Sequence, residues 1–273
     1  MPRGPDIMKL LIYLPARNAG KTLFRTVSSI PRELFNRISG ILIVNNASVD
    51  NTKSEAEKVK KEADLPVSVT IINNETDKGY GGSQKIAYRY AIDNGYDAVV
   101  MLHADGQYPP DKSVELAESL FENKGDDKGV RGGNGADMCI GSRVASGSKT
   151  KMPFWRFVGN RVLTAVEATA FRLGISEYHS GFRAYRCATL AKTNFEKCSN
   201  SYPFDTEMFA IFAANGFRVI EIPVTSIYSK ESNTPKFMEL VEYCSTIFLI
   251  VGEFVLHKYK LRKDERFGGS SNV

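Results

Sequence analysis

The sequence predicts an α/β fold in which a mostly parallel central sheet carries helices on both faces. Short apolar runs that indicate buried strands alternate with segments of helical periodicity through the first hundred residues. The connections between these segments are short, and the chain contains no internal repeat. This alternation is typical of a doubly wound sheet.

The predicted strands are short, mostly apolar runs, as expected where both faces of a strand are buried. They cover residues 9–15, 40–46, 67–73, 97–102, 136–142 and 218–224. The segments between them predict helices within 18–30, over 52–63, over 81–94 after a glycine-rich turn, and over 153–173. The charged, glycine-rich stretch 125–135 predicts a flexible loop.

Composition excludes several classes of protein. The 273 residues are 42% hydrophobic and 25% charged, so disorder throughout the chain is excluded. A net charge of +5 suits phosphates or acidic lipid and is too small to indicate nucleic acid. The four cysteines are widely spaced, without a C-x-x-C pair, which favours a reducing, cytosolic setting. Because no apolar run approaches the roughly 20 residues that span a bilayer, we expect any membrane association to be peripheral, on the cytoplasmic face.

The strongest chemical signal follows the strand predicted over 97–102. In an extended chain alternate side chains point the same way, so His103, Asp105 and Gln107 would face one divalent ion, Mn²⁺ or Mg²⁺. Such an ion offsets the charge of a nucleotide diphosphate. On composition alone, the Asp-Gly and Pro-Pro pairs of this segment indicate an ordinary turn more often than a metal site.

Six short motifs resemble, in their order, the family 2 glycosyltransferases, especially the dolichyl-phosphate mannose or glucose synthase type. The segment above is similar to that family's D-A-D-G-Q-x-x-P, with His103 in place of the first aspartate. The other five are Leu14–Asn18 (LPARN), Ile43–Thr52 (IVNNASVDNT), Gly141–Arg143 (GSR), Ser180–Tyr185 (SGFRAY) and Glu221–Val224 (EIPV). The resemblance covers roughly residues 9–227. It implies a GT-A domain over 8–227, followed by a C-terminal appendage over 228–273.

The resemblance also implies a reaction. The chain would be an inverting, metal-dependent enzyme that transfers a hexose from a UDP- or GDP-linked donor, with a polyprenyl or dolichyl phosphate as the expected acceptor. The alternatives are transfer to a sugar hydroxyl, and a nucleotide-sugar-binding protein with a decayed site. A nucleotidyltransferase would need a glycine-rich loop after the first strand, which Ala16–Gly20 lacks. The sequence leaves the sugar, the nucleotide and the oligomeric state open, including a homo-oligomer.

Donor binding is expected at the polar ends of the strands, because ligands of such sheets bind beyond the carboxyl ends. Asn45 and Asn46 replace the family's paired aspartates. The Asn45 amide can both accept and donate a hydrogen bond, which suits uracil slightly better than guanine, although asparagine is equally common in a plain turn. The expected donor-binding residues are Pro15, Ala16, Arg17, Asn18, Asn45, Asn46, Lys78, Gly79, Lys85, His103, Ala104 and Asp105.

The expected catalytic residues are Asp105, Arg143, Arg183 and Glu177. Both arginines stand in matching motifs, and a guanidinium binds phosphate oxygens bidentately. Glu177 matches a family aspartate three residues before the serine of S-G-F-R. It would be the general base if the acceptor is a hydroxyl, and structural or electrostatic if the acceptor is a phosphate. The nearby His179 is interpreted first as a loop residue.

The last part of the chain predicts an amphipathic helix with a basic end. Apolar residues recur at helical spacing from Phe237 to Val255, and acidic residues among them argue against a membrane span. The basic residues that follow are Lys258, Lys260, Arg262 and Lys263. The apolar face would lie in a membrane interface, with the basic residues among anionic headgroups, or it would pack on its own domain or a second subunit.

Overall fold

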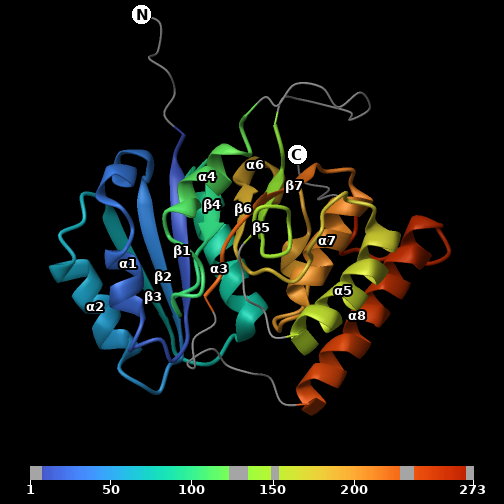
Figure 1. The fold of residues 1–273 in the computed structure, drawn as a ribbon, viewed down its shortest axis with the longest axis horizontal. Helices are drawn as coiled ribbons and strands as arrows, with labels where there is room; N and C mark the ends of the chain where they lie inside the picture. Colours follow the sequence, from blue (N-terminus) through green and yellow to red (C-terminus); the bar gives the residue numbers. More distant parts are fainter. Residues whose placement is uncertain (1–7, 123–134, 149–153, 228–236, 269–273) are drawn as a thin grey trace, which may run out of the picture.

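The computed structural model describes residues 8–122, 135–148, 154–227 and 237–268, without the side chains of 154–156 and 237–241. One seven-stranded sheet lies between two layers of helices, in the order β3-β2-β1-β4-β6-β5-β7 (Figure 1). The strands are β1 (Leu10–Ala16), β2 (Gly40–Asn46), β3 (Ser68–Asn74), β4 (Ala98–Met101), β5 (Met138–Ser142), β6 (Arg183–Arg186) and β7 (Val219–Pro223). Of these strands β6 alone pairs antiparallel, so the predicted α/β fold with a mostly parallel sheet is confirmed.

Each strand divides its side chains between two cores, because alternate residues point to opposite faces of a sheet. In β1, Leu10, Ile12 and Leu14 pack on one face, whereas Leu11 and Tyr13 pack on the other. Helices α1 (Leu23–Ser28), α2 (Thr52–Glu62) and α4 (Lys112–Glu118) cover the first face. Helices α3 (Gly79–Asp93), α5 (Phe154–Phe171), α6 (Cys187–Leu190), α7 (Phe204–Ala214) and α8 (Phe237–Lys258) cover the second. Burial on both faces explains why the central strands β1 and β4 are almost entirely apolar, whereas the edge strand β3 is partly exposed and carries Ser68 and Thr70.

Strand β6 fills the space between β4 and β5. Its first residue, Arg183, pairs with Met101 of β4 and with Ile140 of β5, near the ends of those two strands. An antiparallel strand begins where its neighbours end, so the loop before β6 reaches the same edge as the carboxyl ends of the parallel strands. We call this the strand-end edge: the carboxyl ends of β1 to β5 and the start of β6.

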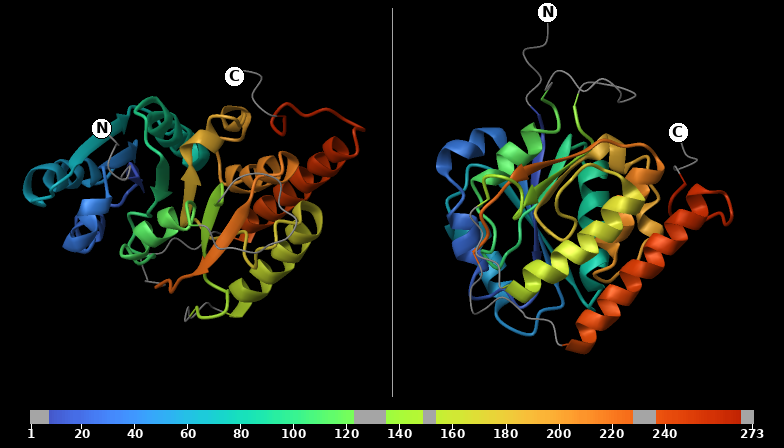
Figure 2. Two further views of the ribbon diagram at one scale, coloured as in Figure 1. Left: turned by 90° about the horizontal axis from the view of Figure 1, so that it is seen from above. Right: turned by 45° about the vertical axis from the view of Figure 1, so that its right-hand side comes forward.

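The C-terminal helix α8 packs on the domain with the apolar stripe that the sequence placed at a membrane interface. Ile247, Ile250 and Phe254 are buried, and the last two belong to the second core. Helix α5 lies beside α8 (Figure 2), and the rings of Phe171 and Phe254 meet edge to face at 5.0 Å. For these side chains, packing on the chain's own domain is therefore the correct alternative. Three members of the predicted stripe, at 237, 240 and 241, lie outside the described side chains.

The segment after α8 turns back and is fastened to the domain by Arg266. Its guanidinium contacts Glu207 of α7 at 2.7 Å and Asp264 at 3.0 Å, and it also pairs with Glu253 of α8. Phe267 is buried in the second core. Residues 237–268 thus share a core with the predicted GT-A domain. No helix in the described ranges is long and apolar enough to cross a membrane.

Candidate active site at the strand-end edge

The ends of β2 and β3 are joined by a ladder of asparagine amides. Asn45 donates from Nδ2 to Asn73 Oδ1 at 2.8 Å, and its own Oδ1 accepts the N–H of Ser48 at 3.3 Å. One residue further on, Asn74 donates to Asn46 Oδ1 at 3.0 Å. Because Asn45 is 4% exposed and both ends of its amide are bonded, it orients neighbouring groups in this structure rather than presenting a free edge.

The loop after β1 joins the same group. Arg17 forms an ion pair with Asp77, and both side chains are about half exposed. Asn18 has a positive φ of 51° and accepts the N–H of Val49 at 3.0 Å, so the ends of β1 and β2 hold each other. Pro15 and Ala16 remain inside β1, and the buried Ala16 offers a ligand only its backbone. The predicted donor-binding residues from these three strands therefore do lie together.

The glycine-rich segment after β3 is the first turn of α3, not a flexible turn before it. A Cβ at Gly79, whose φ is +77°, would lie 2.1 Å from the carbonyl oxygen of Asn200. Lys85 lies one turn later and donates to the carbonyl of Cys198 and to Asn200 Oδ1, so it ties α3 to that loop. Lys78 stays exposed at the helix start, and its N–H donates to Asn46 Oδ1 at 2.9 Å. Of the two lysines, only Lys78 is free to meet a donor phosphate.

The segment from His103 to Gln107 is a turn. Strand β4 ends at Met101 and Gly106 has a φ of +72°, so the expected extended geometry, with three side chains on one side, is wrong. Asp105 is partly exposed; its Oδ1 accepts the N–H of Gln107 at 2.9 Å. Ala104 is buried and its carbonyl accepts the Thr26 hydroxyl at 3.2 Å. The turn therefore presents the Asp105 carboxylate at the same edge of the sheet as the asparagine ladder, with β1 between them.

His103 lies beneath this turn. Its Nε2 is buried without a hydrogen-bond partner, and a Cβ added at Gly181 would lie 2.4 Å from it. Burial lowers the pKa of His103, although the charges of Asp105 and Asp205 oppose that effect. The ring is therefore neutral at pH 7, which is the form that binds metal. In this structure Nε2 faces the Gly181 backbone, and His103 as a metal ligand stays a prediction.

The chemistry of this edge fits a divalent ion that takes most of its ligands from a bound diphosphate. The described residues contain no group of three His, Cys, Asp or Glu side chains that could hold an ion alone. Mg²⁺ sites of nucleotide enzymes commonly combine one or two carboxylates with substrate phosphates. Asp105 supplies one such carboxylate.

Arg143 and Glu177 form a buried pair beyond the end of β5. Glu177 is fully buried, and both its oxygens accept from Arg143: Oε2 from the backbone N–H at 2.6 Å and Oε1 from Nε at 2.7 Å. Asn160 of α5 adds a third bond at 2.8 Å. A carboxylate held in this way is poorly placed to take a proton from an acceptor, so this geometry does not support Glu177 as the general base. Arg143 is 10% exposed and reaches the strand-end edge.

Arg183 and Asp205 form a second buried pair. The guanidinium is fully buried, lies 3.0 Å from Asp205 Oδ1, and donates to the carbonyls of Ser180 at 2.7 Å and Tyr178 at 3.1 Å. Burial alone would lower the pKa of Arg183, but the Asp205 charge raises it overall. Its Nη1 lies near Asp205 but has no hydrogen-bond partner. The guanidinium is buried in this structure, and its contact with a phosphate stays a prediction.

Two residues that sequence reasoning missed belong to this edge. Asp205, at the start of α7, accepts from Tyr80 at 3.1 Å and from Gln84 at 3.0 Å besides pairing with Arg183. Asp77 accepts from Asn46 at 2.6 Å besides pairing with Arg17. Neither stands in one of the six motifs. The available signal for Asp205 was its place in an apolar segment, Phe204–Ala214, where a buried carboxylate needs partners.

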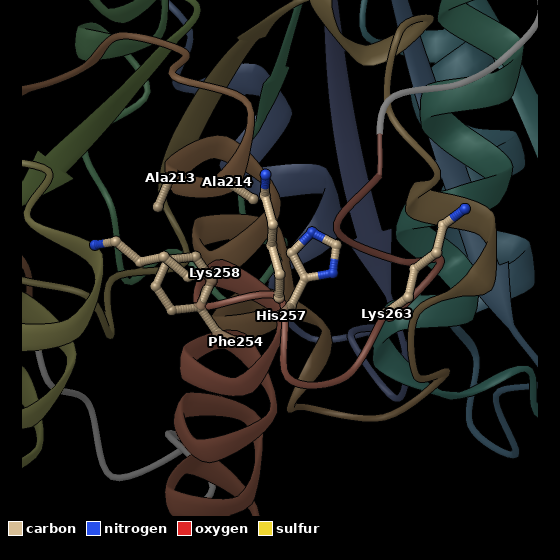
Figure 3. Close-up of a pocket in the computed structure, with 7 residues that line it drawn as sticks. Ala213, Ala214, Phe254, His257, Lys258 and Lys263 are labelled. Atoms are coloured by element: carbon tan, nitrogen blue, oxygen red, sulfur yellow. The ribbon is translucent and has the colours of Figure 1, made fainter.

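A cavity of about 520 Å³ lies elsewhere, between the far ends of α7 and α8 (Figure 3). It is lined by Ala213, Ala214, Phe254, His257, Lys258, Lys260 and Lys263. Figure 3 shows Lys258 and Lys263 pointing to opposite sides, so these two ammonium groups do not converge on one anion. The carboxyl ends of α7 and α8 meet here, and cations near a helix carboxyl end stabilise the helix. None of the lining residues comes from a strand end, so the cavity is separate from the strand-end edge.

Comparison with known proteins agrees with this geometry. The family described as "Glycosyl transferase family 2" matches residues 11–193, about two thirds of the chain. The chain belongs to glycosyl transferase family 2. The matched region contains β1 to β6, and so holds both the strand ends and the two buried pairs except for Asp205.

This family 2 glycosyltransferase is similar to two curated relatives over most of their lengths. It is 28% identical to an undecaprenyl-phosphate mannosyltransferase of Micrococcus luteus, over 81% of this chain and 84% of the relative. It is 27% identical to a UDP-N-acetylglucosamine--dolichyl-phosphate N-acetylglucosaminyltransferase of Methanococcus voltae, over 81% and 88%. A crystal structure of glucosyl-3-phosphoglycerate synthase from Mycobacterium tuberculosis, in complex with Mn²⁺, UDP and phosphoglyceric acid, has the same fold. Its TM-score is 0.57 at 16% identity, over 92% of this chain and 78% of that one.

Proposed function

We propose that this glycosyltransferase moves a hexose from a nucleotide-sugar onto a polyprenyl phosphate, with inversion and with a divalent ion. The observation that carries the proposal is the position of Asp105, a partly exposed carboxylate in the turn after β4. This turn follows the strand next to β1, at the same edge of the sheet as the polar ends of β1, β2 and β3. This is the switch point of the sheet, where neighbouring chain connections run to opposite sides and ligands of such folds bind.

The proposed reaction is a single displacement at the anomeric carbon. An oxygen of the acceptor phosphate forms the new bond to that carbon, while the bond to the nucleotide diphosphate breaks and its electron pair leaves with the diphosphate. A divalent ion, held by Asp105 together with the diphosphate, would offset the charge of the leaving group. Arg143 is our candidate for orienting a phosphate at the same edge; it is 10% exposed, and because its guanidinium already donates to Glu177 and the His179 carbonyl, this role rests on its charge and position.

The nature of the acceptor follows from Glu177. A hydroxyl acceptor needs a base to remove its proton, whereas a phosphate is already an anion at neutral pH. Glu177 is buried and bonded to Arg143 and Asn160, which disfavours its use as that base. This arrangement favours a phosphate acceptor over a sugar hydroxyl.

The comparisons support the same choice. Both curated relatives carry in their names a polyprenyl-phosphate acceptor, and one of them names a UDP-sugar donor. The solved structure of the same fold contains Mn²⁺ and UDP. We leave the donor nucleotide of this chain as UDP or GDP, because the Asn45 amide is bonded on both sides and does not itself discriminate.

We further propose that the chain meets its acceptor at a membrane surface, as a peripheral protein. Two neighbouring helices expose apolar side chains that do not serve the core. On α5 they are Phe157, Val158 and Val162, and on α8 they are Phe248 and Leu249. Phe248 belongs to the predicted stripe, and together with the other four exposed residues it is the candidate lipid contact, whereas Ile247 and Phe254 of the stripe are buried.

A ligand screen tests the proposal. UDP- and GDP-sugars are added with and without Mn²⁺, thermal unfolding is followed, and transfer to a short-chain polyprenyl phosphate is then measured. A donor at about 100 times its Kd stabilises the folded state by about 2.7 kcal/mol, and this stabilisation should require the ion. Metal-independent binding would contradict the ion's role. Binding without transfer to the phosphate, but with transfer to a sugar hydroxyl, would contradict the acceptor.

A further inference from the structure

A buried polar cluster joins three helices to the loop that precedes β6. His179, in that loop, makes one hydrogen bond with its ring: its Nδ1 is 3.2 Å from the Tyr243 hydroxyl on α8. On the other side, Nε2 lies 3.1 Å from Glu167 Oε2 on α5, near enough for an ion pair if the ring is protonated, but without the geometry of a hydrogen bond. The other oxygen of Glu167 accepts the Thr206 hydroxyl of α7 at 3.0 Å. Glu167 is fully buried and Thr206 is 1% exposed.

The backbone of the same residue reaches the strand-end edge. The carbonyl of His179 accepts from Arg143 Nη2 at 2.8 Å, on the guanidinium that also holds Glu177. His179 therefore has two opposite attachments: its ring is fixed in the helical layer, and its carbonyl helps to fix Arg143. A shift of the ring moves the carbonyl, because both belong to one residue of a short loop.

We propose that His179 is a positioning residue for sugar transfer, and that α8 helps to set the active site through the Tyr243 hydroxyl. This inference rests on the proposed function. Glu167 and Tyr243 hold the imidazole, the imidazole holds the loop, and the loop carbonyl orients Arg143 toward the acceptor phosphate. Neither Glu167 nor Tyr243 touches the substrates.

The residues proposed to orient the acceptor are separate from those proposed to bind the donor. The residues that hold the asparagine ladder and Asp105 come from the ends of β2 and β3 and the loops after β3 and β4. Within the part of the chain that the structure describes, these residues make no hydrogen bond to His179, Glu167, Thr206 or Tyr243. Loss of the cluster should therefore lower kcat and raise KM for the acceptor, with little change in donor affinity.

Two substitutions of His179 divide its contacts. Asparagine places an amide atom near the position of Nδ1 and keeps the Tyr243 contact, whereas glutamine reaches the position of Nε2 and keeps the Glu167 contact. His179→Ala loses both, and we expect its kcat/KM for the acceptor to fall by between about ten- and a hundredfold, since small misplacements of orienting groups have effects of that size. Each of the two conservative variants should recover part of the loss. Donor Kd, measured by thermal shift, should stay within about twofold of the parent in all three.

Tyr243→Phe removes a single hydroxyl and should lower kcat/KM by about fivefold, the size of one hydrogen bond. Combined with His179→Ala it should cause no further loss, because the contact is already gone. Tyr90→Phe is the matched control: its hydroxyl lies 3.1 Å from that of Thr70, on the donor side of the sheet, and its effect should add to that of His179→Ala. Additive effects of Tyr243→Phe and His179→Ala would overturn the proposal.

Hydrogen exchange provides a readout that does not depend on activity. The amides of residues 177–183 should exchange faster in His179→Ala and Tyr243→Phe than in the parent, and those of the 45–49 loop should not. Unchanged exchange in 177–183 would overturn the inference even if transfer is demonstrated. If that exchange changes as expected but the parent transfers no sugar to any phosphate, the proposed function fails instead.

Discussion

The two halves of the strand-end edge are built from different chemistry. At the ends of β1, β2 and β3, neutral amides join one strand to the next, and the ion pair found there, between Arg17 and Asp77, is about half exposed. Around β5 and β6 the charges are buried in pairs, Arg143 with Glu177 and Arg183 with Asp205. We call the ends of β1, β2 and β3, with the turn after β4, the open half, because some of its polar side chains are exposed and the ion pair there is weakly held. We call the surroundings of β5 and β6 the framework half, because its charged side chains are largely buried and paired with each other.

This difference changes how a charged residue in a motif should be interpreted. A buried ion pair is strongly destabilised when one partner is removed, because the other charge stays in a medium of low polarity. Loss of activity on mutating Arg183 or Glu177 would therefore not by itself show that either touches a substrate. The comparison predicts where binding and stability can be separated, and four experiments test it.

The largest effect is expected at Asp105, in the open half. Asp105→Ala removes the carboxylate that would hold the ion with the diphosphate, so metal-dependent donor binding should fall by about a hundredfold or more while the melting temperature without ligand barely changes. Calorimetric titration with Mn²⁺ and the nucleotide-sugar measures it. Asp111→Asn, an exposed acid nearby, is the control. Donor binding equal to that of the parent would show that the ion site lies elsewhere.

The next effect concerns the framework half. Arg143→Ala leaves Glu177 buried without its main partner, and the free energy of unfolding should fall by about 3–5 kcal/mol. Arg17→Ala breaks the exposed pair with Asp77 and should cost less than about 1 kcal/mol. Urea unfolding of both variants gives the comparison. Glu177→Gln added to Arg143→Ala should restore part of the loss, because it removes the unpaired charge. Equal losses at Arg17 and Arg143 would erase the distinction between the halves.

A smaller effect on stability is expected at acid pH, through the ion pair of Asp264 with Arg266. Hydrogen bonding from Arg266 lowers the pKa of Asp264 from its ordinary value. Since the folded state holds the charged form more firmly than the unfolded chain does, this contribution is complete above about pH 4 and is lost as the pH falls through the lowered pKa. The free energy of unfolding, measured between about pH 5 and 2, should fall less steeply with decreasing pH in Asp264→Asn than in the parent. An unchanged slope would mean that the Arg266 contacts are not formed in solution.

The smallest effect on catalysis is expected from the basic residues after α8. Lys258, Lys260 and Lys263 line the cavity at the far ends of α7 and α8, away from the strand-end edge. Replacing these three and Arg262 with glutamine should leave transfer to a short, water-soluble acceptor within about twofold of the parent. Binding to anionic liposomes should weaken by about 1 kcal/mol per charge at low salt and by less at high salt. If transfer to the soluble acceptor also fell, the basic segment would be needed for the fold.

The regular parts of the fold could be predicted from the sequence, and particular elements show why others could not. Strand β2 was predicted with the bounds Gly40–Asn46 that the structure has, because a strand buried on both faces is a continuous apolar run. Helix α7 was missed because it is buried on nearly all sides and so lacks an amphipathic period. Strand β6 is four residues long, too short for any period to show.

The site, too, has residues whose position could be predicted from the sequence and residues whose position could not. Asp105 and the asparagines of β2 could be placed at one edge from the end of each strand alone, and the structure does bring them together. The pairing of Arg143 with Glu177 joins residues 34 positions apart, with helix α5 between them in the sequence, so no spacing in the sequence indicates it. The same holds for the ion pair of Arg183 with Asp205, and Arg183 as a phosphate ligand stays a prediction.

Strand β6 has a consequence for how the chain is assembled on the ribosome. It is made after β4 and β5, yet it lies between them, so β4 has no neighbour on that side until residue 186 has been synthesised. During this interval the first four strands can pair among themselves, while β5 waits for both β6 and β7. The half of the edge at the ends of β1, β2 and β3 can thus form early. The half around β5 and β6 can form only after β6 has paired between β4 and β5. A nascent chain halted before residue 183 would expose the edge of β4 to other chains, and an exposed strand edge invites aggregation.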